Sequence, residues 1–144
     1  MRVFLCSYSG FSLAVPMQSV LSIFLVREEP AEKKTAYKTE NSCLHISLPE
    51  LFKNPDSKIH HGIIINNEDN RNGVIKNILL STEIQSESDI PCGKFYPIPK
   101  TLGGFRFSQF FNGIHFNSPK DGADMTLLLD PFKLILKVEK EFLS

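Results

Sequence analysis

The chain has 144 residues, 42% of them hydrophobic, with 16 basic and 16 acidic side chains and a formal net charge of zero. This length suits one compact unit or two small barrels that share a core, and it requires no disulfide or metal for stability. The balanced charge creates no overall field that would favour nucleic acid or an anionic membrane surface. The hydrophobic fraction and the 12 Phe residues indicate a folded domain and not a disordered tail.

The three cysteines, Cys6, Cys43 and Cys92, are far apart and include no CxxC pair. This usage predicts a reducing compartment and buried thiols without disulfides. Residues 11–26 carry no charge, which raises the alternative of a signal peptide. However, a proline and a glutamine interrupt the run, a charged segment follows where a cleavage site should lie, and the run is too short to span a bilayer. We therefore expect a cytoplasmic protein.

The hydrophobic pattern of the first half predicts a series of short strands. Apolar runs flank Ser9-Gly10, a typical turn dipeptide, and so predict a hairpin. Further along, aliphatic residues alternate with His45 and Ser47, which indicates a strand with the aliphatic side chains on one face and the polar ones on the other. Pro49 can then open a single helical turn. The strands expected here cover residues 3–8, 11–15, 20–26 and 43–48, and the helical turn covers residues 49–52.

Residues 27–40 form the most charged part of the chain, with four positive and four negative side chains and no large aliphatic residue. Such a mixed-charge segment is typical of a solvated loop. A polar arm that binds a partner is the alternative interpretation.

The second half shows the same alternation of short apolar runs and turns. Residues 62–65 and 74–80 flank a polar turn and are expected to pair as a hairpin, whereas the Ser- and Pro-rich residues 85–100 are expected to form a loop. Asn112-Gly113 is a strong two-residue hairpin signal, with Ile114 and Phe116 in the return strand. Short strands separated by turns favour an all-β barrel or sandwich.

The last predicted strand, residues 125–129, runs directly into Asp130-Pro131. Asp130 can accept hydrogen bonds from the first free helical N–H groups, and Pro131 suits the first helical position because it has no N–H. A short amphipathic helix is therefore expected to close the chain. Its apolar stripe is expected to consist of Phe132, Ile135, Leu136 and residues 138–142.

The polar residues give little indication of a catalytic or metal site. His60 and His61 are adjacent, so in a strand their side chains would point to opposite faces and could not easily bind one metal. Cys43 and His45 lie two residues apart on one strand face, which leaves open a metal site or a thiolate–imidazole pair. A buried thiol beside a surface imidazole is the other interpretation. We expect no catalysis, no cofactor and no metal, and a β-domain of this kind usually serves as a binding module.

Three segments, taken in order, resemble the CheW-like domain, an adaptor of bacterial chemotaxis. The first, followed by Val20, is similar to the family's opening pattern of a small residue, an aliphatic residue, Pro and then Val. The second resembles the family's glycine–aliphatic–Val-Asp-x-Val strand, and the third its final Leu-Asp-Pro strand end. The segments are FSLAVP at 11–16, GVIKNIL at 73–79 and LLDPFKL at 128–134.

The resemblance is incomplete in the region where typical members contact receptors. Ser47 stands where the family has an acidic residue, Pro49 where it has arginine, and Asn77 where it usually has Asp. The Asn-Leu-Arg-Gly turn that normally precedes this region has no counterpart, and the charged residues 27–40 replace it. The apolar positions of the fold are retained, but the arginine-bearing turn that helps to contact receptors is lost.

The resemblance implies that residues 1–144 form a single domain of two packed five-stranded SH3-like β-barrels with a short C-terminal helix. The first barrel would cover about residues 11–59 and face the kinase. The second would cover about residues 60–136 and close the groove in which receptor tips dock.

The resemblance also implies a non-catalytic adaptor that couples chemoreceptors to the chemotaxis histidine kinase. Its partners would be the regulatory domain of the kinase and, with the departures above, the cytoplasmic tip of chemoreceptors, without nucleic acid or membrane insertion. The alternative is a divergent CheW-like scaffold that binds another protein, through the 27–40 segment, and has lost receptor coupling. The candidate contact residues are the aliphatic side chains Val20, Ile23, Leu25, Ile46 and Leu48.

Overall fold

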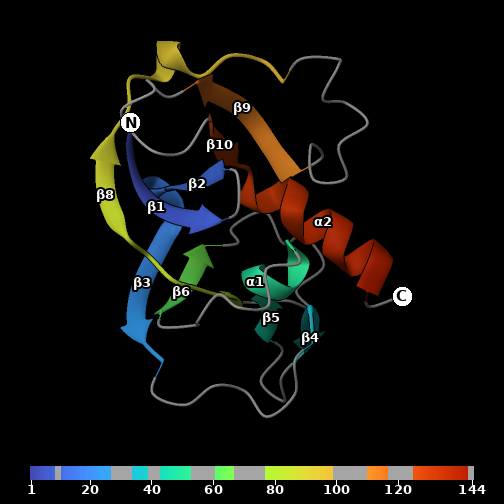
Figure 1. Cartoon of the computed structure of the whole chain (residues 1–144). Helices are drawn as coiled ribbons and strands as arrows, with labels where there is room; N and C mark the ends of the chain where they lie inside the picture. The colour runs from blue at the N-terminus through green and yellow to red at the C-terminus, as the bar shows by residue number, and fades with distance from the viewer. Residues whose placement is uncertain are drawn as a thin grey trace. The chain divides into compact units, whose positions relative to one another are not determined.

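The computed structural model describes residues 1–8, 11–26, 34–38, 43–52, 61–66, 77–98, 110–116 and 125–142. These parts of the chain are mostly β-strand, and two α-helices accompany the strands (Figure 1). The chain divides into two compact units. One consists of Met1–Gln18 with Ile84–Lys137, and the other consists of Ser19–Glu83 with Val138–Ser144.

The first unit contains a five-stranded sheet in the order β8-β1-β2-β10-β9. Strands β1 and β2 pair antiparallel with Tyr8 opposite Phe11, which confirms the predicted hairpin around Ser9-Gly10. Strand β10 confirms the predicted strand at 125–129, and it pairs with β2 in parallel. The strands are β1 (Arg2–Tyr8), β2 (Phe11–Pro16), β8 (Ser86–Asp89), β9 (Phe111–Phe116) and β10 (Met125–Leu129).

Small and medium apolar side chains of this first sheet pack together as a buried cluster. Each of three strands contributes to it, as does the residue that follows β8, and Met1, Leu5 and Phe95 pack against it. The buried members are Val3, Ala14, Ile90 and Leu128.

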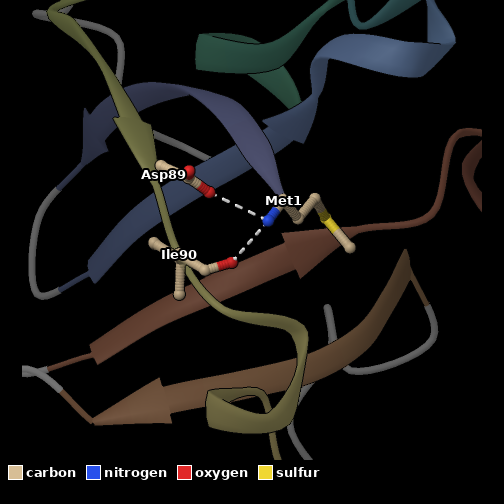
Figure 2. A network of polar contacts seen from close by, with 3 residues as sticks. All are labelled: Met1, Asp89 and Ile90. Carbon is tan, nitrogen blue, oxygen red and sulfur yellow. Dashed lines mark hydrogen bonds and ion pairs between the residues drawn. The ribbon is translucent and has the colours of Figure 1, made fainter.

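The start of β1 is fixed to the end of β8 by the Met1 amine (Figure 2). The amine donates to Asp89 Oδ1 at 2.9 Å and to the Ile90 carbonyl oxygen at 3.0 Å. The hydrogen bond to Asp89 favours the charged ammonium and raises the pKa of the amine above its ordinary value. Arg2 also forms an ion pair with Glu87 at 3.3 Å. Strand β8 is therefore held to the start of β1 at two of its residues, Glu87 and Asp89.

The second unit contains a five-stranded sheet in the order β3-β6-β7-β5-β4. Strands β6 and β7 pair antiparallel, which confirms the predicted second hairpin for its described residues; residues 74–76 lie outside them. Helix α1 (Leu48–Leu51) confirms the predicted helical turn, with Pro49 in its first turn. The strands are β3 (Val20–Leu25), β4 (Ala36–Lys38), β5 (Cys43–Ser47), β6 (His61–Asn66) and β7 (Asn77–Thr82).

The division into sheets differs from the predicted barrel ranges 11–59 and 60–136. Strand β2 pairs with β10, and β6 and β7 share a sheet with β3 and β5, so both sheets mix the two predicted ranges. The reason is that parallel partners lie far apart in sequence and leave no local signal. Among the described strands, no pairing of β8 with β9 or of β3 with β4 closes either sheet into a barrel.

Two predictions for the second half of the chain were wrong. Residues 85–100 are not all loop, because Ser86–Asp89 forms β8 and pairs with β1. Asn112-Gly113 is not a turn but lies within β9. Gly113 serves close packing instead, since a Cβ there would lie 3.1 Å from the Phe95 Cβ, and the register with β10 shifts at Leu128/Leu129.

Helix α2 (Pro131–Phe142) begins where the sequence predicts. Asp130 Oδ1 accepts hydrogen bonds from the backbone N–H groups of Phe132 at 2.9 Å and Lys133 at 3.2 Å. The predicted apolar stripe was partly wrong, because Phe132 and Leu136 are exposed. The buried side chains of α2 are Pro131, Leu134, Ile135 and Val138. No helix in the described ranges is long and apolar enough to cross a lipid bilayer.

We expect Asp130→Ala to destabilise the protein by about 0.5–2 kcal/mol, because two N–H groups at the start of α2 lose their acceptor. Urea unfolding followed by circular dichroism would measure the change. Asp130→Asn is the matched control, since Asn also caps helices well, and it should retain most of the stability. Equal stability of Asp130→Ala and the unaltered chain would contradict this role for the carboxylate.

Candidate interaction surface

Three of the five predicted contact residues share one face of β3. Val20, Ile23 and Leu25 stand opposite Ile65, Ile63 and His61 of β6, which alternate along that strand. Because directly paired residues of antiparallel strands point to the same side, all three side chains lie on one face of the sheet. Their exposure increases along the strand, from a half-buried Val20 through Ile23 at 36% to Leu25 at 71%.

The other two predicted contact residues are in the core. Ile46 and Leu48 are both 0% exposed. Ile46 lies in β5, which has β7 on one side and β4 on the other, and Leu48 begins α1. Neither side chain presents a surface to a partner in this structure, so the candidate surface consists of β3 alone.

Sequence reasoning missed two further exposed apolar residues of β3. Leu21 is 59% and Phe24 is 41% exposed. The Phe24 ring lies over Gly62 of β6, where a Cβ would overlap with the ring carbon Cζ. The glycine therefore makes room for an aromatic ring that covers it from the neighbouring strand. The feature that could have revealed this contact is an aromatic residue that stands opposite a glycine on the neighbouring strand. Recognising such a pair requires the register of the two strands, which the sequence alone does not give.

The predicted polar face of β5 is buried and not exposed. His45 is 3% and Ser47 is 4% exposed. The His45 ring contacts Tyr37 of β4 edge-to-face, with ring centroids 4.6 Å apart. The sequence pattern was misleading because β5 is an inner strand of the sheet and both of its faces are covered. Burial disfavours the charged imidazolium and lowers the pKa of His45.

The alternative left open for metal or thiol chemistry rests on Cys43 and His45. The side chain of Cys43 and all of His60 lie outside the described residues. Within the described residues, no three His, Cys, Asp or Glu side chains gather as a group that could hold a metal ion. Cys6 is buried as expected, whereas Cys92 is exposed, which corrects the prediction for that thiol.

The charged segment 27–40 is described only at residues 34–38. Ala36–Lys38 forms β4, the edge strand opposite β3 in the second sheet, so this part is not a loop. The remainder of the segment lies outside the described residues.

The sequence matches no protein-family model. It is also not significantly similar in sequence to any curated protein. In structure, the chain is similar to the scaffolding protein TtCheW from Thermoanaerobacter tengcongensis, with a TM-score of 0.60 and 13% sequence identity. The similarity covers 90% of this chain and 84% of that chain. The chain therefore has a CheW-like fold, as the three sequence segments predict.

We expect the stability of the protein to fall on acidification below about pH 6.5, the ordinary pKa of histidine. The unfolded chain takes up a proton at His45 there, while the folded chain does so only at lower pH. The free energy of unfolding should thus rise with pH up to about pH 6.5, and His45 can contribute at most about 1.4 kcal/mol per pH unit to this rise. Above that pH, the contribution of His45 should not change with pH.

Urea unfolding at several pH values between about 5 and 8 would measure this slope. The variant His45→Phe keeps an aromatic ring against Tyr37 and should flatten the slope of stability against pH. The variant His115→Gln should leave this slope unchanged. Parallel pH profiles for the unaltered protein and His45→Phe would show that His45 does not cause the effect.

Proposed function

We propose that this chain is a non-catalytic adaptor that couples chemoreceptors to the chemotaxis histidine kinase in bacterial signal transduction. Its direct partner in this proposal is the regulatory domain of the kinase. The CheW-like fold supports it, since the similar TtCheW is described as a scaffolding protein. In its full form the proposal has residues 1–144 as one cytoplasmic domain, in which the two five-stranded sheets are SH3-like barrels, the second of them open between β3 and β4.

The single observation that carries an interaction role is the exposed apolar strand β3. Its exposed aliphatic side chains lie on a strand and not on a loop, so they form a defined surface. A soluble domain that keeps such a patch exposed usually uses it to bind another protein. A strand or helix of a partner can cover it without any reactive group.

A second candidate function is a divergent CheW-like scaffold that binds another protein partner and no longer couples receptors. The structure at two positions favours this second candidate. They are the positions at which the CheW-like family has an acidic residue and an arginine. Ser47 and Pro49 are both buried, and Pro49 is part of α1. These two positions therefore present neither a carboxylate nor a cation to a receptor.

Isothermal titration calorimetry with the kinase regulatory domain from the same cell should detect binding by the unaltered chain. We expect Leu25→Asp to weaken it at least about tenfold, because burying a leucine contributes about 1.5–3 kcal/mol and each 1.4 kcal/mol is a factor of ten. Leu136→Asp replaces an equally exposed leucine on α2 and is the matched control.

Absence of heat at high micromolar concentrations of both proteins would contradict the adaptor proposal. Titration with the cytoplasmic tip of a chemoreceptor separates the two candidates. Binding of both partners supports receptor coupling, whereas binding of neither supports the scaffold that binds another protein. Kinase binding without receptor binding would keep the kinase contact of the first proposal and remove its receptor coupling.

A further inference from the structure

Strand β3 is the edge of the second sheet and carries no charged residue. Its sequence, VLSIFL, also contains no proline. Native proteins usually protect edge strands with charges, by making them short, or by covering them, because a bare edge pairs readily with another strand. No strand in the described part of the chain pairs with the outer side of β3.

The three other sheet edges show the protection that β3 lacks. Strand β8 carries Glu87 and Asp89, which form ion pairs with Arg2 and the Met1 amine. Strand β4 has only three residues, and short edge strands resist further pairing. Strand β9 is covered at Ile114, which exchanges two backbone hydrogen bonds of 2.8 Å with Tyr96.

The two faces of β3 make different demands on a strand added beside it. Ile23 and Leu25 are exposed on the face that they share with Ile63. Phe24 lies on the opposite face, above Gly62. A complementary strand must therefore bring aliphatic side chains on one face and an aromatic or small one on the other.

Strand β3 itself meets these demands. We propose that a second copy of this chain pairs its β3 with this edge, antiparallel, about a two-fold axis at Phe24 and normal to the sheet. In this register Ile23 faces Leu25 of the second copy, Leu25 faces its Ile23, and the two Phe24 rings are neighbours. Ser22 and Val26 form the outer pairs, so the contact brings no charged side chains together.

The neighbouring register, centred on Ile23, is less suitable. It would pair Leu25 with Leu21, and Leu21 is the extra residue at which the register between β3 and β6 shifts. Such a residue disrupts regular pairing. The register centred on Phe24 uses only residues 22–26, beyond the irregularity. Because a two-fold axis makes the same patch meet itself, the assembly closes as a dimer and does not extend into a fibre.

This dimer goes beyond the proposed adaptor function and does not depend on it. Sedimentation velocity of the full chain alone tests it. The mass should rise from the monomer value of 16.3 kDa towards twice that value between about 5 and 500 µM, since a contact of one short strand is small. Phe24→Lys places two lysines side by side and should weaken the dimer at least tenfold. Leu136→Lys, which alters a leucine on α2 that is 68% exposed, should leave it unchanged.

Cysteine cross-linking tests the register, in a Cys43→Ser/Cys92→Ser background. It removes the thiol that is exposed in the described part of the chain and the thiol whose side chain is not described there. Phe24→Cys should form a disulfide with itself under mild oxidation, because directly opposed Cα atoms lie about 4.5–5.5 Å apart, within disulfide range. Ile23→Cys and Leu25→Cys should each remain largely uncrosslinked alone, since the diagonal distance is about 7–8 Å, but should link when mixed.

Three results would overturn the inference. The first is a monomer at all concentrations, including a chain that binds the kinase domain through β3 without self-associating. The second is a dimer that Leu136→Lys weakens as much as Phe24→Lys. The third is equal cross-linking of all three single cysteine variants. Circular dichroism would show whether Phe24→Lys folds, and the cysteine variants provide the independent readout if it does not.

Discussion

Each of the two sheets depends on a single parallel strand pairing. The first sheet consists of an antiparallel group, β8-β1-β2, and an antiparallel pair, β10-β9, and only the β2–β10 pairing joins them. The second sheet repeats this plan, with β3-β6-β7 and β5-β4 joined by β5–β7. Antiparallel neighbours can form through short turns, but a parallel pair needs a crossover connection. These two pairings therefore decide which segments become neighbours and which edges stay open.

The β2–β10 pairing also sets the position of the closing helix. Ser12–Ala14 meets Thr126–Leu128, more than 100 residues along the chain. Asp130 follows directly, donates its backbone N–H to the Phe110 carbonyl oxygen at 2.8 Å and caps α2 with its side chain. The β2–β10 pairing thus fixes where the start of the helix lies relative to the sheet. Such a long-range contact is formed at a high entropic cost, which makes this sheet slower to form than its hairpins.

The sequence predicts what depends on neighbouring residues and not what depends on distant ones. The hairpin β1–β2, helix α1 and the capped start of α2 all have local signals, and all are present. Strand β8 pairs with β1, a partner far along the chain, and the prediction of a loop there was wrong. The parallel pairings, which bring segments of both predicted barrel ranges into each sheet, likewise leave no local signal.

Asn112-Gly113 shows the same limit within one dipeptide. A glycine in a turn and a glycine in a strand packed against another backbone look alike in sequence, and only the contact with Phe95 distinguishes them.

The candidate surface was half predicted for the same reason. Alternation identifies which side chains share a face, and Val20, Ile23 and Leu25 do so. It does not reveal whether a strand lies at the edge of a sheet or inside it. Both faces of β5 are covered, which buries Ile46 together with His45, whereas Ile23 and Leu25 of the edge strand β3 are exposed. The difference between core and surface thus depends on tertiary packing, which alternation does not encode.

The two proposed uses of β3 exclude each other at the level of residues. A second copy would cover Ile23 and Leu25, which are also candidate contacts for the kinase domain. A chain paired through β3 would then have to dissociate before this strand could bind a partner. Because the two contacts compete for the same strand, the outcome depends on concentration, and self-association would lower the apparent affinity for the kinase domain as the chain accumulates. A kinase affinity that is independent of the chain's concentration would mean that the partner binds elsewhere or that the dimer does not form.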